Sequence, residues 1–135
     1  YIQQVKKNAS ILGEVLMSNG IDIVTGGTDS HMVLVDLRSK NVTGKDAEES
    51  LERAGMTCNK NGVANDPNPP TITSGIRLGS PAATTRGFKE EEFKFIGEKI
   101  STIINNLSVS NSDISMLESS INKEVQDLCS KYPIY

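Results

Sequence analysis

Arg77 is the residue of this sequence whose chemistry most needs an explanation. It stands in a run of small and apolar residues, 73–82, with Gly75 and Gly79 two residues to either side. The run predicts a short strand. Because apolar residues flank Arg77 directly, we do not expect its charge to lie freely in solvent. A guanidinium on a strand beside glycines can bind a carboxylate through two parallel hydrogen bonds. The alternative is an ion pair with an acidic residue of the chain itself.

Asn61 is a second candidate, at the start of a polar segment without periodicity. The segment, residues 60–71, contains Pro67, Pro69 and Pro70. Irregular segments of this length in a compact domain are usually functional loops or disordered, and prolines favour a defined path. The Asn61 amide can both donate and accept hydrogen bonds there, although an ordinary turn residue is the simpler interpretation.

Other patterns of catalytic or metal-binding residues are weak. Gly26-Gly27-Thr28 lacks the lysine and the following helix of a phosphate loop, so we expect a tight connection. His31 is the one histidine, which leaves no zinc-site spacing and no visible partner for a general base. We interpret Glu48, Glu49 and Glu52 as a solvated helix face.

Length and composition fit one domain with a real core, or a fragment of a larger protein. Of the 135 residues only 4% are aromatic, so the core must be mainly aliphatic. The net charge of −3 argues against nucleic-acid or anionic-membrane partners, which need basic patches. No apolar run approaches the ~18 residues of a membrane span, and no signal peptide is apparent. Cys58 and Cys129 are predicted to be buried free thiols in a reducing, cytoplasmic environment.

The hydrophobic periodicity predicts an α+β fold, in which a small, mostly antiparallel sheet is covered on one face by helices. Gly20 and Gly55 are typical of helix ends, and Thr43 with Asp46 three residues later is typical of a helix start. The first two strands are joined closely enough to be antiparallel neighbours. The expected elements are helix 1–18, strands 21–24 and 31–37, a helix between Thr43 and Gly55, strand 56–59, loop 60–71, a strand within 73–82, a long helix from Glu90, and a helix over 114–128.

Several separate motifs, in the same order along the chain, resemble the C-terminal domain of serine hydroxymethyltransferase. They cover nearly the whole chain, which makes them more specific together than any one alone. The matching stretches are VTGGTDSH (24–31), VLVDLR (33–38), TGKDAE (43–48), NKN (59–61), TSGIRLGSPA (73–82), TRGF (85–88) and KYPIY (131–135).

The resemblance implies a pyridoxal 5'-phosphate enzyme of the aspartate-aminotransferase fold type, which interconverts serine and glycine and passes the one-carbon unit to tetrahydrofolate. In the family, the arginine that matches Arg77 binds the substrate carboxylate, and the asparagine that matches Asn61 contacts the folate. Many members carry Ser-Pro-Phe near the folate where this chain has Pro69-Pro70-Thr71. The aromatic contact is therefore lost at Thr71, which makes folate binding by this loop less secure than carboxylate binding by Arg77.

The lysine that holds the cofactor belongs to a motif of the family's large domain, and no such motif occurs here. Pyridoxal chemistry needs a lysine Schiff base, whereas Lys40, Lys45 and Lys60 are predicted to be loop or exposed lysines. Residues 1–135 are thus predicted to be the small C-terminal domain, with no catalytic, cofactor-binding or metal-binding residue and no activity alone. The resemblance also implies a large domain of the same protein and a parent homodimer or homotetramer.

Two other classes of protein remain open at this point. A free-standing regulatory domain that binds amino acids would have the same sheet-and-helix layout, since fold does not settle function. A pure interaction domain would instead bind a partner through an exposed apolar stripe.

Overall fold

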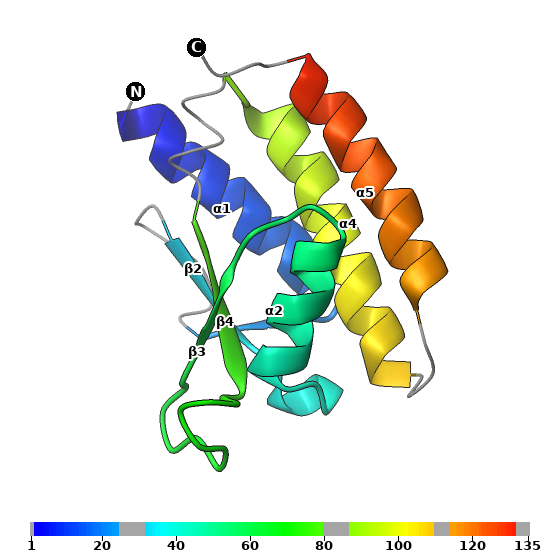
Figure 1. Cartoon of the computed structure of the whole chain (residues 1–135). Coiled ribbons are helices and arrows are strands. Elements are labelled where there is room, and N and C mark those ends of the chain that lie inside the picture. The colour runs from blue at the N-terminus through cyan, green and yellow to red at the C-terminus, as the bar shows by residue number, and fades with distance from the viewer. Residues whose placement is uncertain (1, 25–31, 80–86, 110–113, 132–135) are drawn as a thin grey trace.

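The computed structural model describes residues 2–24, 32–79, 87–109 and 114–131. Helices and strands in these ranges follow the predicted order and confirm the α+β class (Figure 1). The elements are α1 (Ile2–Ser18), β1 (Asp22–Ile23), β2 (Met32–Asp36), the 3-10 helix η1 (Arg38–Lys40), α2 (Gly44–Arg53), β3 (Asn59–Asn61), β4 (Gly75–Gly79), α4 (Glu90–Val109) and α5 (Ser115–Ser130).

The four strands form one sheet in the order β1-β2-β4-β3, and every neighbouring pair is antiparallel. The predicted antiparallel pairing of the first two strands is therefore confirmed. The predicted strand 56–59 is wrong for residues 56–58, because pairing with β4 begins only at Asn59. Met56 and Cys58 are nevertheless buried on either side of exposed Thr57, which explains why the sequence there resembles a strand.

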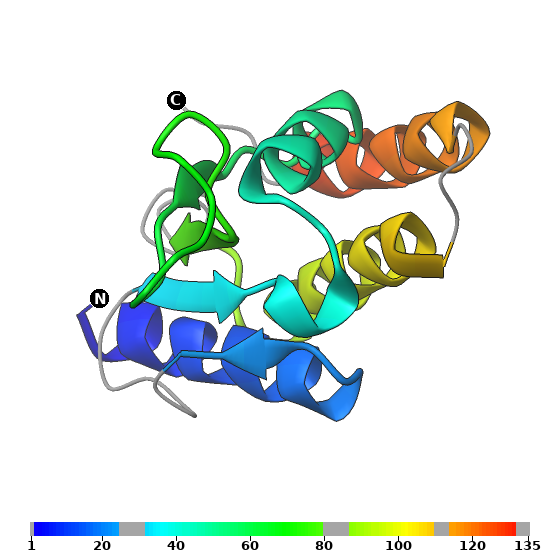
Figure 2. The ribbon, with the colours of Figure 1, turned by 90° about the horizontal axis from the view of Figure 1, so that it is seen from below.

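The described helices cover one face of the sheet, and none of them packs on the other face, here called the open face. α1 packs against β1 and β2, and α2 packs against β3 and β4. α4 packs on α1 and α2, and α5 packs against α2 and α4. In Figure 2, β3 and β4 lie to the left, and α4 and α5 lie to the right. The core is mainly aliphatic, as predicted, and its largest fully buried side chains are Leu16, Ile21, Leu37, Leu51, Ile76, Ile103, Ile104 and Ile121.

The predicted helix boundaries have the expected local geometry. The Thr43 hydroxyl accepts a hydrogen bond from the Asp46 backbone N–H at 3.1 Å, which satisfies one free donor at the start of α2. Gly20 and Gly55 follow helices with φ angles of +82° and +87°. Residues with a side chain rarely adopt this left-handed backbone conformation, so glycine is favoured at both helix ends.

A buried asparagine joins α1 to the segment before α4. Asn8 is fully buried on the apolar face of α1. Its Nδ2 donates to the Phe88 carbonyl at 3.0 Å, and its Oδ1 accepts from Gln4 Nε2 at 2.8 Å. These bonds satisfy an amide that would otherwise be costly to bury.

Glu48 is not simply part of a solvated face, which corrects one prediction. Its carboxylate accepts a hydrogen bond from the Lys60 backbone N–H at 2.7 Å and lies 3.5 Å from Lys60 Nζ. β3 is an edge strand of the sheet, and edge strands leave backbone donors without a strand partner. Glu48 therefore connects α2 to the outer edge of β3.

α5 is joined to α2 through a buried carboxylate, that of Glu118, which is only 3% exposed. It accepts a short hydrogen bond from the Ser50 hydroxyl. Both Arg53 Nε and Nη2 donate to it, at 2.8 and 3.0 Å. Asn122 on α5 also donates to the Arg53 carbonyl at 3.0 Å. Polar contacts thus hold the two helices together beside their apolar packing.

Glu118→Ala is expected to lower the free energy of unfolding by about 2 kcal/mol. The change leaves the buried Ser50 hydroxyl without its acceptor and removes two charge-assisted bonds from Arg53. Arg53 is 58% exposed and can be hydrated instead, so the cost stays below that of a fully buried pair. Urea denaturation measures the change. Glu98→Ala, at an exposed glutamate of α4, is the matched control, and equal stability of both variants would contradict the role of Glu118.

Candidate functional site

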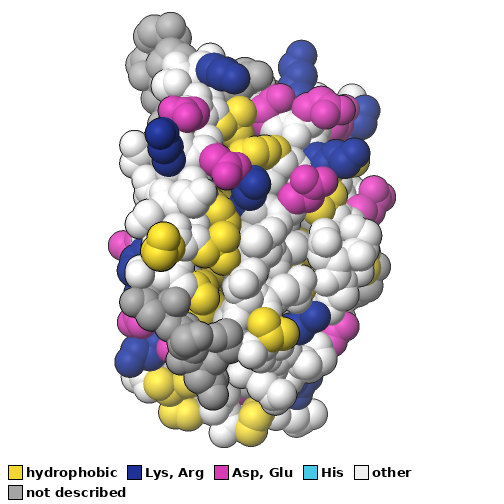
Figure 3. Space-filling model, turned by 90° about the vertical axis from the view of Figure 1, so that its right-hand side faces the viewer, with side chains coloured by type: hydrophobic (Ala, Val, Ile, Leu, Met, Phe, Trp, Pro, Cys, Tyr) yellow, Lys and Arg dark blue, Asp and Glu magenta, His cyan; other side chains and the backbone are white. Residues whose placement is uncertain are grey.

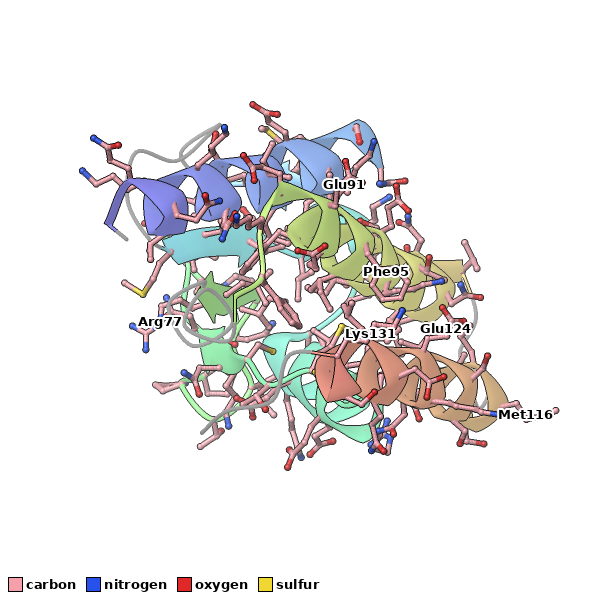
Figure 4. All side chains as sticks on the ribbon, turned by 90° about the horizontal axis from the view of Figure 1, so that it is seen from above. Arg77, Glu91, Phe95, Met116, Glu124 and Lys131 are labelled. Atoms are coloured by element: carbon pink, nitrogen blue, oxygen red, sulfur yellow. The ribbon has the colours of Figure 1, made fainter. Side chains whose placement is uncertain are left out.

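Arg77 lies in the middle of β4, on the open face of the sheet. Ile76 and Leu78 point into the core on the opposite face, as the two-residue period of a strand requires. The Arg77 side chain is exposed, and Figure 4 shows it pointing away from α4 and α5. The expectation that its charge would not lie in solvent is therefore wrong, because apolar neighbours in a strand occupy the other face.

Among the described residues, the neighbours of Arg77 along β4 on its own face are small. Gly75 and Gly79 are the neighbours of Arg77 on the same face of the same strand, so no side chain stands directly before or after it along β4. Leu34 and Asn59 lie opposite Arg77 on the two adjacent strands. A planar guanidinium with a hydrophobic neighbour on one side and an amide on the other can bind a small carboxylate.

The Arg77 side chain forms no hydrogen bond or ion pair with any residue that the structure describes. Asp36, which shares the open face of the sheet, is bound by Arg38 instead. Arg38 Nη2 lies 2.6 Å from Asp36 Oδ2, and Arg38 Nε lies 3.0 Å from Oδ1. These hydrogen bonds hold the pKa of Asp36 below its ordinary value. Within the described ranges, the alternative of an internal ion pair for Arg77 is therefore not realised.

Asn61 lies on the same open face as Arg77. Asn61 pairs with Gly75, two residues along the strands from the pair of Asn59 and Arg77. Asn61 and Arg77 are therefore diagonal neighbours on the same face, with Cα atoms roughly 7–8 Å apart. Asn61 Nδ2 donates to the Gly62 carbonyl at 2.9 Å. Its Oδ1 accepts no hydrogen bond from the described part of the chain and can accept one from a ligand.

The loop after Asn61 is ordered by Asp66, which the sequence reasoning missed. Asp66 Oδ2 accepts from the N–H groups of Val63 and Ser74, at 3.2 and 2.8 Å. Its Oδ1 accepts from the Asn68 N–H and the Ser74 hydroxyl, at 2.8 and 2.7 Å. The bond to Asn68 makes an Asx-turn, which the Asp-Pro sequence could have indicated.

These hydrogen bonds lower the pKa of Asp66 to about 2 from an ordinary 3.8, and the bond from the Ser74 hydroxyl makes the largest contribution. The pKa of Asp66 is lower in the folded protein than in the unfolded chain, so the ionised carboxylate stabilises the loop above about pH 4. That contribution is lost as the pH falls from about 4 towards 2.

Two hollows elsewhere in the molecule do not belong to this site. An apolar one of about 300 Å³, lined by Cys58, Leu78 and Cys129 among others, lies on the covered side of the sheet. Both cysteines are free, as predicted, although only Cys58 is buried and Cys129 is half-buried. Burial, with a smaller contribution from nearby glutamates, raises the pKa of Cys58 to about 12, so this thiol is unreactive.

The second hollow is a groove between α4 and α5, lined by Glu91, Phe95, Glu124 and Lys131 among others. Figure 3 shows acidic and basic side chains interspersed on this side of the molecule. Lys99 pairs with Glu124 at 2.8 Å and lies over the Phe95 ring, 5.2 Å from its centroid. Such a mixed surface is typical of a solvated helix face.

The described residues form no buried-lysine site, no metal site and no membrane-spanning helix. All lysines of the chain lie in the described ranges, and none is buried. No group of three or more His, Cys, Asp or Glu side chains in these ranges could hold a metal ion. None of the helices described here has the length and apolar character to cross a membrane. The predictions for residues 26–28 and His31 concern positions outside the described ranges.

The fold and the site define an α+β domain whose open sheet face presents an arginine suited to bind an anion, beside an ordered polar loop. A sequence model described as "Serine hydroxymethyltransferase" matches residues 1–100. The chain is 57% identical over 135 residues to the serine hydroxymethyltransferase of Paramagnetospirillum magneticum and 55% identical to that of Rhodospirillum centenum. It is also 54% identical to that of Acidiphilium cryptum.

The chain therefore belongs to the serine hydroxymethyltransferase family. All of its residues are covered in these alignments, but it spans only about a third (32%) of the length of each relative.

Proposed function

We propose that residues 1–135 form the small C-terminal domain of a serine hydroxymethyltransferase. The whole enzyme would interconvert serine and glycine, with tetrahydrofolate as the one-carbon carrier, in the cytoplasm and as a homodimer or homotetramer. Family membership and the length of the relatives support this proposal. A large domain of the same protein would complete the active site.

In this proposal, Arg77 binds the carboxylate of the amino-acid substrate. The observation that carries it is the exposed guanidinium between Gly75 and Gly79, without a partner among the described residues. Asp36 lies nearby on the same face but is bound to Arg38, so it does not neutralise Arg77. A carboxylate held by two parallel bonds would fix the orientation of the substrate on the open face.

Asn61, with Pro69, Pro70 and Thr71, would form part of the folate site. Asn61 shares the open face with Arg77, and the three loop residues are exposed. Asn61 Oδ1 is available to accept a hydrogen bond from a folate ring. Thr71 offers a hydroxyl where the family resemblance implies an aromatic ring, so this contact would be polar and not apolar.

Pyridoxal 5'-phosphate does not fit the residues of this chain. The cofactor needs a lysine Schiff base and a partner for its pyridine nitrogen, whereas no lysine here is buried or faces an enclosed site. We therefore propose that the large domain binds the cofactor, and that this chain contributes substrate-binding side chains only.

The isolated chain, supplied with serine, tetrahydrofolate and pyridoxal phosphate, is expected to show no serine–glycine exchange. Conversion of serine to glycine, followed by NMR, measures this, with the intact enzyme as the positive control. Turnover above the background of free pyridoxal phosphate would contradict the proposal. Tight binding of glycine by the isolated chain, measured by calorimetry, would instead favour a free-standing amino-acid sensor.

A further inference from the structure

The segment between β3 and β4 is organised around one carboxylate, that of Asp66. We propose that Asp66 is a positioning residue, which fixes Pro69, Pro70 and Thr71 beside β4 and thereby sets the affinity for tetrahydrofolate. The inference rests on the proposed function, because it concerns the same candidate folate site.

Asp66 connects three separate points of the loop. Its partners are Val63 near the start, Asn68 in the middle and Ser74 at the end, directly before β4. A single side chain therefore closes the segment 63–74. Without these bonds, the backbone donors of Val63 and Ser74, both buried residues, would lack an acceptor inside the loop.

Asn68 extends the same network to the tip of the loop. Its Nδ2 donates to the Ser74 hydroxyl at 2.8 Å and to the Thr73 carbonyl at 3.2 Å. The Pro69 carbonyl accepts from the N–H groups of Ile72 and Thr73, both at 2.9 Å. Pro70 and Thr71 lie inside this turn, so their position follows from the bonds on either side of them.

The end of the loop is held in a conformation that needs such support. Thr73 has a φ angle of +58°, which is a genuine outlier for a β-branched residue. Its carbonyl accepts from the Gly44 N–H at 3.1 Å, and its hydroxyl donates to the Gly75 carbonyl at 3.1 Å. Strained residues of this kind persist only where the surroundings fix them, and they occur often at functional sites.

Arg77 depends much less on this network than the loop does. Strands β2 and β3 pair with β4 on both sides, opposite Leu34 and Asn59. Loss of the Asp66 bonds should therefore displace the loop tip while leaving Arg77 in place. This difference predicts a defect that is specific to folate and spares the amino-acid substrate.

The test compares Asp66→Asn and Asp66→Ala with the unmodified protein, all as the intact enzyme that contains this chain. We expect the KM for tetrahydrofolate to rise about tenfold in Asp66→Ala and less in Asp66→Asn, which keeps one acceptor oxygen. The KM for serine should stay within about twofold. Amide hydrogen exchange should become faster at Val63, Asn68 and Ser74. Asp127→Asn, the same change on the exposed face of α5, is the control and should alter none of these values.

Three results would overturn the inference. Unchanged amide exchange in the loop would show that Asp66 does not order it. Faster exchange with an unchanged KM for tetrahydrofolate would show that loop order does not affect folate binding. Equal increases in the KM values for serine and tetrahydrofolate would show a general structural defect. Failure of the proposed function differs from all three, because the unmodified enzyme itself would then show no serine–glycine interconversion.

Discussion

Arg77→Lys is expected to lower kcat/KM for serine by about 10- to 100-fold in the intact enzyme. Lysine keeps the positive charge but offers a point charge in place of the planar, two-pronged guanidinium. Each charge-assisted hydrogen bond contributes about 1.5–3 kcal/mol, and loss of one such bond corresponds to this range. Steady-state kinetics with varied serine measures the effect on KM and kcat separately.

Arg53→Lys is the matched control for this experiment. Arg53 lies on α2, on the covered side of the sheet, and pairs with Glu118. The control should leave kcat/KM unchanged, because the same chemical change occurs away from the open face. An unchanged kcat/KM in Arg77→Lys as well would exclude Arg77 as the substrate-carboxylate ligand.

Gly44→Ala is expected to destabilise the fold by about 3 kcal/mol. A Cβ at Gly44 would lie 2.0 Å from Thr73 Oγ1 and 2.4 Å from the Gly75 carbonyl oxygen. The Gly75 oxygen belongs to the backbone of a central strand, so it cannot move aside as the end of a flexible side chain could. Overpacking of this kind costs typically 1–3 kcal/mol and sometimes more.

Gly62→Ala is the control for this substitution. A Cβ there would lie 3.8 Å from Asp66 Oδ2, an ordinary contact distance, so the free energy of unfolding should change by less than about 0.5 kcal/mol. Urea denaturation monitored by circular dichroism compares the two variants. Similar midpoints for Gly44→Ala and Gly62→Ala would show that α2 and β4 can separate without a large cost.

Local sequence signals were sufficient to predict most of the fold. The cap at Thr43 and the left-handed glycines at Gly20 and Gly55 depend only on neighbouring residues, and such signals can be found in a single sequence. The orientation of Arg77 was also available in principle. Strict alternation with Ile76 and Leu78 places it on the open face, because the apolar neighbours of a strand residue occupy the opposite face and do not surround its side chain.

The polar contacts between distant segments could not be predicted in the same way. Asn8 binds a carbonyl 80 residues away, and Glu118 binds Ser50 across 68 residues. Periodicity indicates which face of a helix is buried, but it does not identify the partner of a polar group on that face. Glu118 falls on the apolar stripe of α5, between Ile114 and Ile121, and that position was the one available sign that it is buried.

The packing of α1 on α4 has a consequence for synthesis on the ribosome. Roughly 70 residues separate Ser18 from Glu90, and at about 5–20 residues per second their translation takes about 4–14 s. During this interval the apolar face of α1 lacks its main helical partner, and Asn8 lacks the Phe88 carbonyl. The apolar face of α1 is therefore covered by α4 only seconds after α1 itself has been synthesised.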